Sequence, residues 1–99
     1  MTKDDAQKPS FSLVPQVALL AVARIMTFGA AKYGRLNWKQ PDDHPVPRPS
    51  RLLDAAQRHI NAHLRGEAID ADSGEPHLAH AAASIMMALE LTVEQQETQ

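Results

Sequence analysis

Histidines gather in the second half of this chain, at spacings that suit a metal or phosphate site. His59 and His63 are four residues apart, and His77 and His80 are three apart. In helices, these spacings place each pair on one face, so each pair could converge on one ion or phosphate. A neutral imidazole can bind a metal or accept a proton. For any single histidine, a hydrogen bond that only pins a loop is an equal alternative.

Carboxylates lie between the two histidine pairs. Glu67 and Asp70 are three residues apart, and Asp72 follows them. Such hard oxygen ligands suit Mg²⁺ or Mn²⁺ that bridges substrate phosphates, although loop carboxylates are often just solvated. We therefore take Glu67, Asp70, His77 and His80 as candidate metal ligands, and Glu67, His77 and His80 as candidates for water activation. A zinc hydrolase built on the histidines is a further alternative.

A short segment earlier in the chain combines cations, aromatic rings and an amide. It runs K-Y-G-R-L-N-W over residues 32–38. Tyr33 or Trp38 could stack on a nucleobase, Asn37 could hydrogen-bond its edge, and Lys32 could bind phosphate. The alternative is a tight turn at Gly34 with Trp38 folded back onto the core.

Two residues near the first histidine pair complete the candidate substrate site. Arg58 could hold phosphate, and His59 beside it could contact substrate. Alternatively, Arg58 forms a surface ion pair with Asp54, four residues earlier.

Three helices are expected to position these groups. The first starts after Ser12, a plausible cap, has Pro15 in its first turn, and reaches about Phe28, where Gly29 could interrupt it. It is apolar nearly all round, which predicts burial on every face. Three helices alone cannot provide that cover, so a homodimer or tetramer is expected.

Proline, glycine and apolar spacing delimit the other helices. A proline-rich connector spans 39–50, a second helix runs from near Ser50 to Leu64 before Gly66, and a third runs from Pro76 to about Val93. The expected buried stripes are Leu53, Ala56, Ile60 and Leu64 on the second helix and Leu78, Ala82, Ile85 and Leu89 on the third. The alanine run at 79–84 would permit close packing. Residues 1–11 should form a flexible arm, 12–93 a single helical domain, and 94–99 a frayed tail.

Composition supports a small all-α domain. The 99 residues are 43% hydrophobic but only 4% aromatic, which suits a tightly packed helical bundle. The net charge of −2 argues against duplex nucleic acid or a membrane surface as partner. The absence of cysteine and of a long apolar segment favours a cytoplasmic protein.

Several motifs together resemble a known family. The most specific are F-G-A-A-K-Y-G-R-L-N-W and G-E-A-I-D-A-D-S-G-E-P-H-L-A-H, within a match from about Lys8 to Leu91. They resemble the phage-associated family described as the N-terminal domain of dATP/dGTP diphosphohydrolases.

The resemblance implies an all-α nucleotide pyrophosphohydrolase similar to the MazG group. Such an enzyme uses a divalent metal to hydrolyse a purine deoxynucleoside triphosphate to monophosphate and pyrophosphate, and so adjusts nucleotide pools during phage infection. MazG helices carry E-x-x-E and E-x-x-D, whereas this chain has only Asp54 on its second helix and H-L-A-H on its third. Either a different metal site replaces the acidic one, or the domain binds nucleotide without hydrolysis. A purely structural helical phage protein is the other alternative, and it predicts that Arg58 and His77 are both buried and paired.

Overall fold

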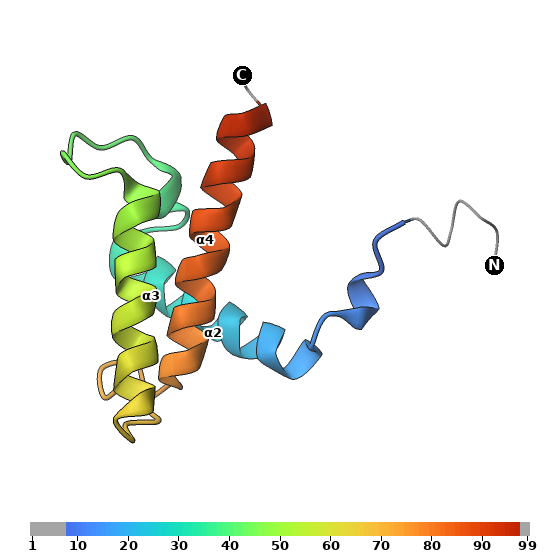
Figure 1. Cartoon of the computed structure of the whole chain (residues 1–99), viewed down its shortest axis with the longest axis vertical. Coiled ribbons are helices and arrows are strands. Elements are labelled where there is room, and N and C mark those ends of the chain that lie inside the picture. Colours follow the sequence, from blue (N-terminus) through green and yellow to red (C-terminus); the bar gives the residue numbers. More distant parts are fainter. Residues whose placement is uncertain (1–7, 98–99) are drawn as a thin grey trace.

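The computed structural model describes residues 8–97, and within them it is built from helices. The order is η1 (Phe11–Leu13), α2 (Gln16–Tyr33), η2 (Asn37–Lys39), α3 (Arg48–Leu64) and α4 (His77–Glu97). Helices α3 and α4 lie side by side, and α2 crosses them with its first turns extending beyond α4 (Figure 1). The only β pairing in the described part is an isolated bridge between Ile69 and Pro76. The predicted all-α class with three main helices is confirmed.

Helix α2 is longer than expected at its C-terminal end. It continues through Gly29 to Tyr33, so the expected interruption at Gly29 is wrong; a glycine costs a helix only about 1 kcal/mol and does not by itself end it. The helix ends at Gly34, whose φ of 98° favours glycine and whose N–H donates to the carbonyl of Ala30. Ser12 does not cap α2, because it lies inside η1 and Pro15 holds the cap position.

The connector is anchored to the helix that follows it. Helix α3 begins at Arg48, slightly before the expected Ser50, with Pro49 in its first turn. The Asp42 carboxylate accepts hydrogen bonds of 2.6 Å from both Arg48 and Arg51, and Arg48 also donates to the carbonyl of Asn37 at 2.7 Å. The exposed connector is thus tied both to α3 and to the segment that precedes it.

These contacts give a prediction for connector stability. The Arg48 and Arg51 guanidinium groups hold the pKa of Asp42 well below its usual range, so the contacts stabilise the fold above about pH 4 and are lost as the pH falls and Asp42 is protonated. Asp42→Asn is expected to lower the Tm slightly at pH 7, with a difference from wild type that shrinks below about pH 4. Thermal unfolding followed by circular dichroism measures this. Asp43→Asn is the matched control, and an equal loss in that variant would contradict the prediction.

The loop between α3 and α4 is held together by its own backbone hydrogen bonds. The N–H of Asp70 donates to the carbonyl of Glu75, and the N–H of His77 donates to the carbonyl of Ala68. Helix α4 then starts at His77, directly after Pro76 as expected, and continues to Glu97. The expected end near Val93 is therefore about one turn too early. Of the expected arm and tail, Met1–Gln7 and Thr98–Gln99 lie outside the described residues.

Small residues form most of the core. Ala56 of α3 and Ala83 of α4 are almost fully buried, and Val22 and Ile25 of α2 pack with Ala79 and Ala83. The expected close approach at the alanine run is confirmed. The expected stripe of α4 is wrong, because the alanine face makes the contacts and leaves the larger side chains exposed. The exposed members of the two predicted stripes are Leu53, Leu64, Leu78, Ile85 and Leu89.

Helix α2 is not buried on every face in this single chain. Only Val22 and Ile25 are buried along it, while Val17 is 85% and Leu20 51% exposed. The first turns extend past α4, so no described part of the chain covers them. The homodimer or tetramer inferred from this helix stays a prediction. No helix within 8–97 is both long and apolar enough to cross a membrane.

Candidate functional site

A cavity of about 720 Å³ lies where the three long helices and the α3–α4 loop meet. Its volume is in the range of sites that hold small molecules. One wall comes from the end of α2 and η2, and the opposite wall comes from α3, the loop and α4. The polar and aromatic residues that line it are Thr27, Phe28, Lys32, Tyr33, Arg35, Asn37, Trp38, His59, Asp70, Asp72, His80 and Ser84.

The first wall is shaped by the turn that ends α2. Gly34 has a φ of 98° and Leu36 a φ of 57°, and the N–H of Asn37 donates to the carbonyl of Gly34. The tight turn considered from the sequence is therefore present. It brings Tyr33, Asn37 and Trp38 to the cavity together.

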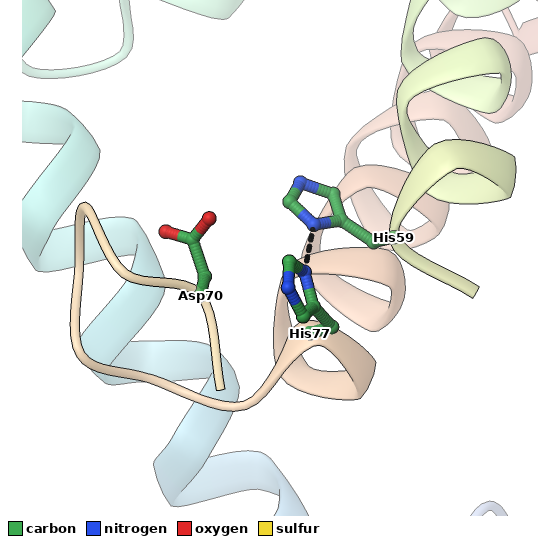
Figure 2. Close-up of side chains that lie close together, drawn as sticks. All are labelled: His59, Asp70 and His77. Atoms are coloured by element: carbon green, nitrogen blue, oxygen red, sulfur yellow. Dashed lines mark hydrogen bonds between the residues drawn. The ribbon is translucent and has the colours of Figure 1, made fainter. Parts of the chain in front are cut away.

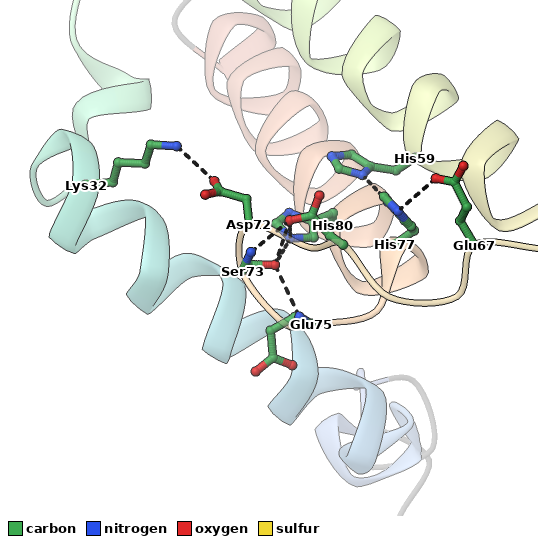
Figure 3. A network of polar contacts seen from close by, with 9 residues as sticks. Lys32, His59, Glu67, Asp72, Ser73, Glu75, His77 and His80 are labelled. Carbon is green, nitrogen blue, oxygen red and sulfur yellow. Dashed lines mark hydrogen bonds and ion pairs between the residues drawn. The ribbon is translucent and has the colours of Figure 1, made fainter.

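Ion pairs fix this wall against the rest of the domain. Lys39, next to Trp38, contacts Glu90 at 2.9 Å and Glu94 at 2.6 Å on α4. Lys32 contacts Asp72 of the α3–α4 loop at 3.1 Å (Figure 3). Hydrogen bonding to Asp72 is the main cause that raises the pKa of Lys32, so this side chain stays cationic.

Three imidazole rings cluster at the opposite wall, and two of them, His59 and His80, line the cavity. The Nδ1 atoms of His59 and His77 are 2.9 Å apart, so one ring donates a hydrogen bond to the other (Figure 2). The rings of His59 and His80 stack, with centroids 4.6 Å apart and planes 13° from parallel. Burial lowers the pKa of His59, and the neighbouring His80 and His77 lower it further. A positive charge on the His59 ring is therefore disfavoured.

Asp70 is held beside this cluster by the loop. Its Oδ2 accepts hydrogen bonds from the backbone N–H of Ser73 at 3.0 Å and from the Ser73 hydroxyl at 2.9 Å, and lies 3.5 Å from His80 Nε2. Burial raises the pKa of Asp70, but the bonds from Ser73 and the nearby His80 and His77 together lower it below its usual value. Asp70 is thus an ionised, fixed carboxylate.

Ser73 links Asp70 to His80, a role that the sequence analysis missed. Its hydroxyl lies 2.6 Å from His80 Nε2 and accepts a bond from the N–H of Glu75 at 3.2 Å. Because that hydroxyl donates to the Asp70 carboxylate, His80 Nε2 must carry the proton and donate to Ser73. When the ring is neutral, this tautomer leaves Nδ1 of His80 without a proton. Aspartate side chains commonly accept hydrogen bonds from nearby backbone N–H groups in turns, so an aspartate shortly before Ser73 and Gly74 was the available signal.

The structure separates the remaining candidates from the cavity. Arg58 is exposed, does not line the cavity, and makes no ion pair within residues 8–97, with Asp54 or otherwise. His63 is exposed and does not join His59. His77 is 8% exposed and lies behind His59, with its Nε2 4.0 Å from Glu67. A purely structural role for the protein predicted that Arg58 and His77 would both be buried and paired. His77 is buried and paired, but Arg58 is neither, so that prediction is wrong.

The arrangement combines two chemical capabilities in one cavity. The first wall offers aromatic faces, an amide and the cations Lys32 and Arg35. The second offers imidazole nitrogens and the carboxylate of Asp70, which can move protons or hold a metal ion. These groups come from segments that are far apart in the sequence.

Comparisons with known proteins agree on one family. The family described as "dATP/dGTP diphosphohydrolase, N-terminal" matches residues 1–99. A protein of Salmonella phage PMBT28 named dATP/dGTP diphosphohydrolase is 36% identical over 84 residues, which cover 85% of this chain and 27% of the relative. The chain thus spans about a quarter of the length of that curated relative. No solved structure matches the chain.

Proposed function

Because this chain belongs to the family of dATP/dGTP diphosphohydrolase N-terminal domains, we propose that its cavity binds a purine deoxynucleoside triphosphate and hydrolyses it to monophosphate and pyrophosphate. The observation that carries this proposal is the composition of the cavity, which joins the segment suited to a nucleobase to the histidine and carboxylate wall. In a phage-infected cell the reaction would take place in the host cytoplasm and adjust nucleotide pools.

The turn after α2 is the proposed binding site for the base. Trp38 and Tyr33 offer aromatic faces for stacking. The side-chain amide of Asn37 makes no hydrogen bond within the described range, so its donor and acceptor are available to the edge of a purine. Its backbone carbonyl accepts from Arg48, which fixes the residue in place.

The phosphates need more positive charge than this wall supplies. Lys32 and Arg35 are the cations of the cavity, and Lys32 is already shared with Asp72. A triphosphate carries several negative charges, so two lysine or arginine side chains do not neutralise it. A divalent cation, for which the sequence suggests Mg²⁺ or Mn²⁺, would supply the missing charge and lower the pKa of an attacking water.

Proton transfer from the attacking water is assigned to the histidine wall. His80 has an unprotonated Nδ1 when Ser73 donates to Asp70, and both His59 and His80 line the cavity. A neutral imidazole can accept the proton of a water molecule that attacks the α-phosphorus.

Product analysis tests the proposal. The purified chain is incubated with each of the four deoxynucleoside triphosphates and with Mg²⁺ or Mn²⁺, and the products are separated by ion-exchange chromatography. We expect monophosphate and pyrophosphate from dATP or dGTP and none from the pyrimidine nucleotides. Equal turnover of all four would contradict the assigned purine specificity.

A nucleotide-binding module without turnover is the second candidate. This candidate is favoured because the chain covers only 27% of the length of the phage relative. Groups needed for hydrolysis could lie in the rest of such longer proteins. The binding module predicts stabilisation by nucleotide without pyrophosphate release. A ligand at a hundred times its Kd stabilises the folded state by about 2.7 kcal/mol, which a thermal shift readily detects. Neither turnover nor stabilisation would contradict both candidates.

The tryptophan provides a separate prediction for binding. Trp38 is the single tryptophan of the chain, so its fluorescence reports directly on the cavity. Nucleotide is expected to change this fluorescence, and Trp38→Ala is expected to weaken binding about 5-fold or more, since stacking of a base contributes about 1–3 kcal/mol. Calorimetric titration of the variant measures the second effect. Phe11→Ala, which removes an aromatic ring outside the cavity, should bind as the wild type does.

A further inference from the structure

The donor atoms around His59 form a compact group. One nitrogen each from His59 and His77 and one carboxylate oxygen of Asp70 all lie within 4.8 Å of one another (Figure 2). We propose that these three side chains bind a transition-metal ion such as Zn²⁺, Co²⁺ or Mn²⁺ in preference to Mg²⁺. In this proposal His59 is a metal ligand, and Glu67 orients the ligand His77.

The spacing of the two histidines fits two ligands of one ion. Zinc lies about 2.0–2.1 Å from imidazole nitrogen, so two such ligands at octahedral or tetrahedral angles are about 2.9–3.4 Å apart. The Nδ1 atoms of His59 and His77 are 2.9 Å apart. Both rings can therefore bind one ion after small movements, and the proton that one Nδ1 carries between them leaves to solvent.

Each of the three ligands is held by further groups, as is usual at metal sites. The Nε2 of His77 faces the Glu67 carboxylate at 4.0 Å, Asp70 is fixed by two hydrogen bonds from Ser73, and the His59 ring is stacked on His80. An imidazole whose second nitrogen faces a carboxylate is oriented and made more basic. The site is therefore largely formed before any ion binds.

The kinds of ligand determine which ions fit. Mg²⁺ prefers oxygen ligands and keeps several waters, whereas two imidazoles with one carboxylate suit zinc and its neighbours. The donor set therefore does not favour Mg²⁺. Such a three-ligand set leaves coordination positions free for water or substrate. His59 and Asp70 line the cavity, so those positions would face it.

The site itself follows from this geometry alone, whereas a contact between the ion and nucleotide phosphate rests on the proposed function. The test therefore measures metal binding without nucleotide. The whole chain is titrated with Co²⁺, followed by visible absorption, and with Zn²⁺, followed by calorimetry. We expect one ion per chain, retained when Mg²⁺ is added in large excess.

Variants on one helix locate the ion. His59→Ala is expected to weaken Co²⁺ and Zn²⁺ binding more than about 100-fold, since even the loss of an outer-shell partner costs about 10–100-fold. His63→Ala is the matched control, because His63 is exposed on the same helix and outside the cluster. Asp70→Asn should also weaken binding, and it provides the test if the buried His77 cannot be replaced without unfolding.

The outcomes separate this inference from the proposed function. Absence of Co²⁺ and Zn²⁺ binding, displacement by equimolar Mg²⁺, or an equal loss in His63→Ala would overturn the metal site. Tight binding of Co²⁺ or Zn²⁺ that depends on His59 and Asp70, without nucleotide turnover, would support the metal site and count against hydrolysis by this chain. Hydrolysis with Mg²⁺ that is unaffected by His59→Ala would support hydrolysis by this chain and count against the metal site.

Discussion

Replacing Asp70 with asparagine is expected to lower the rate of dATP or dGTP hydrolysis by about 100-fold or more. Asp70 is the carboxylate that the loop fixes beside His59 and His80, and its low pKa keeps it negatively charged. Asparagine retains an oxygen that can accept the bonds from Ser73 but removes the charge. The loop should therefore keep its shape, and the rate of pyrophosphate release under saturating nucleotide measures the loss.

Asp54→Asn is the matched control for this experiment. Asp54 is an exposed aspartate of α3 that does not line the cavity. Its variant should keep the wild-type rate, and both variants should keep the helical circular dichroism spectrum. An Asp70→Asn variant with more than half of the wild-type rate would remove Asp70 from the proposed chemistry.

Ala83→Leu is expected to destabilise the domain by about 1–3 kcal/mol. Ala83 is 1% exposed and packs with Val22, Ile25 and Ala79 where α2 meets α4. The added carbon atoms of leucine would push α2 away from α4 or force strained rotamers. For a domain of this size, each kcal/mol corresponds to about 4–8 °C in Tm, which thermal unfolding measures.

An alanine on the exposed side of α2 provides the comparison. Ala23 is exposed, so Ala23→Leu adds the same atoms without meeting α4. Its Tm should stay close to that of the wild type. Equal Tm values for Ala83→Leu and Ala23→Leu would mean that α2 does not pack on α4 as described.

The sequence predicted where the helices lie better than which faces they bury. Pro76 and Gly66 are local signals, and the helices around them begin and end close to the expected positions. The spacing of Leu78, Ile85 and Leu89 also predicted a buried stripe, but these residues are exposed. Periodicity identifies an apolar face, whereas close helix contact depends on small side chains, and the two criteria selected different faces of α4.

The candidate site was predicted in part for a similar reason. Spacing alone makes His63 as good a partner for His59 as any residue on another helix. Only the packing of α3 against α4 selects His77 and His80 instead. Likewise, nothing local indicates that Trp38 and Asp70 share a cavity, because that depends on how α2 crosses the other helices.

The turn at Gly34 also constrains how a nucleotide could lie. Helix α2 ends there, so its last carbonyl groups give this side of the cavity a partial negative charge that Lys32 and Arg35 offset, whereas His77, where α4 begins, does not line the cavity. Under the proposed function, a bound triphosphate would therefore place its uncharged base rather than its phosphates against the last carbonyl groups of α2, and its phosphates would need Lys32, Arg35 and a divalent cation.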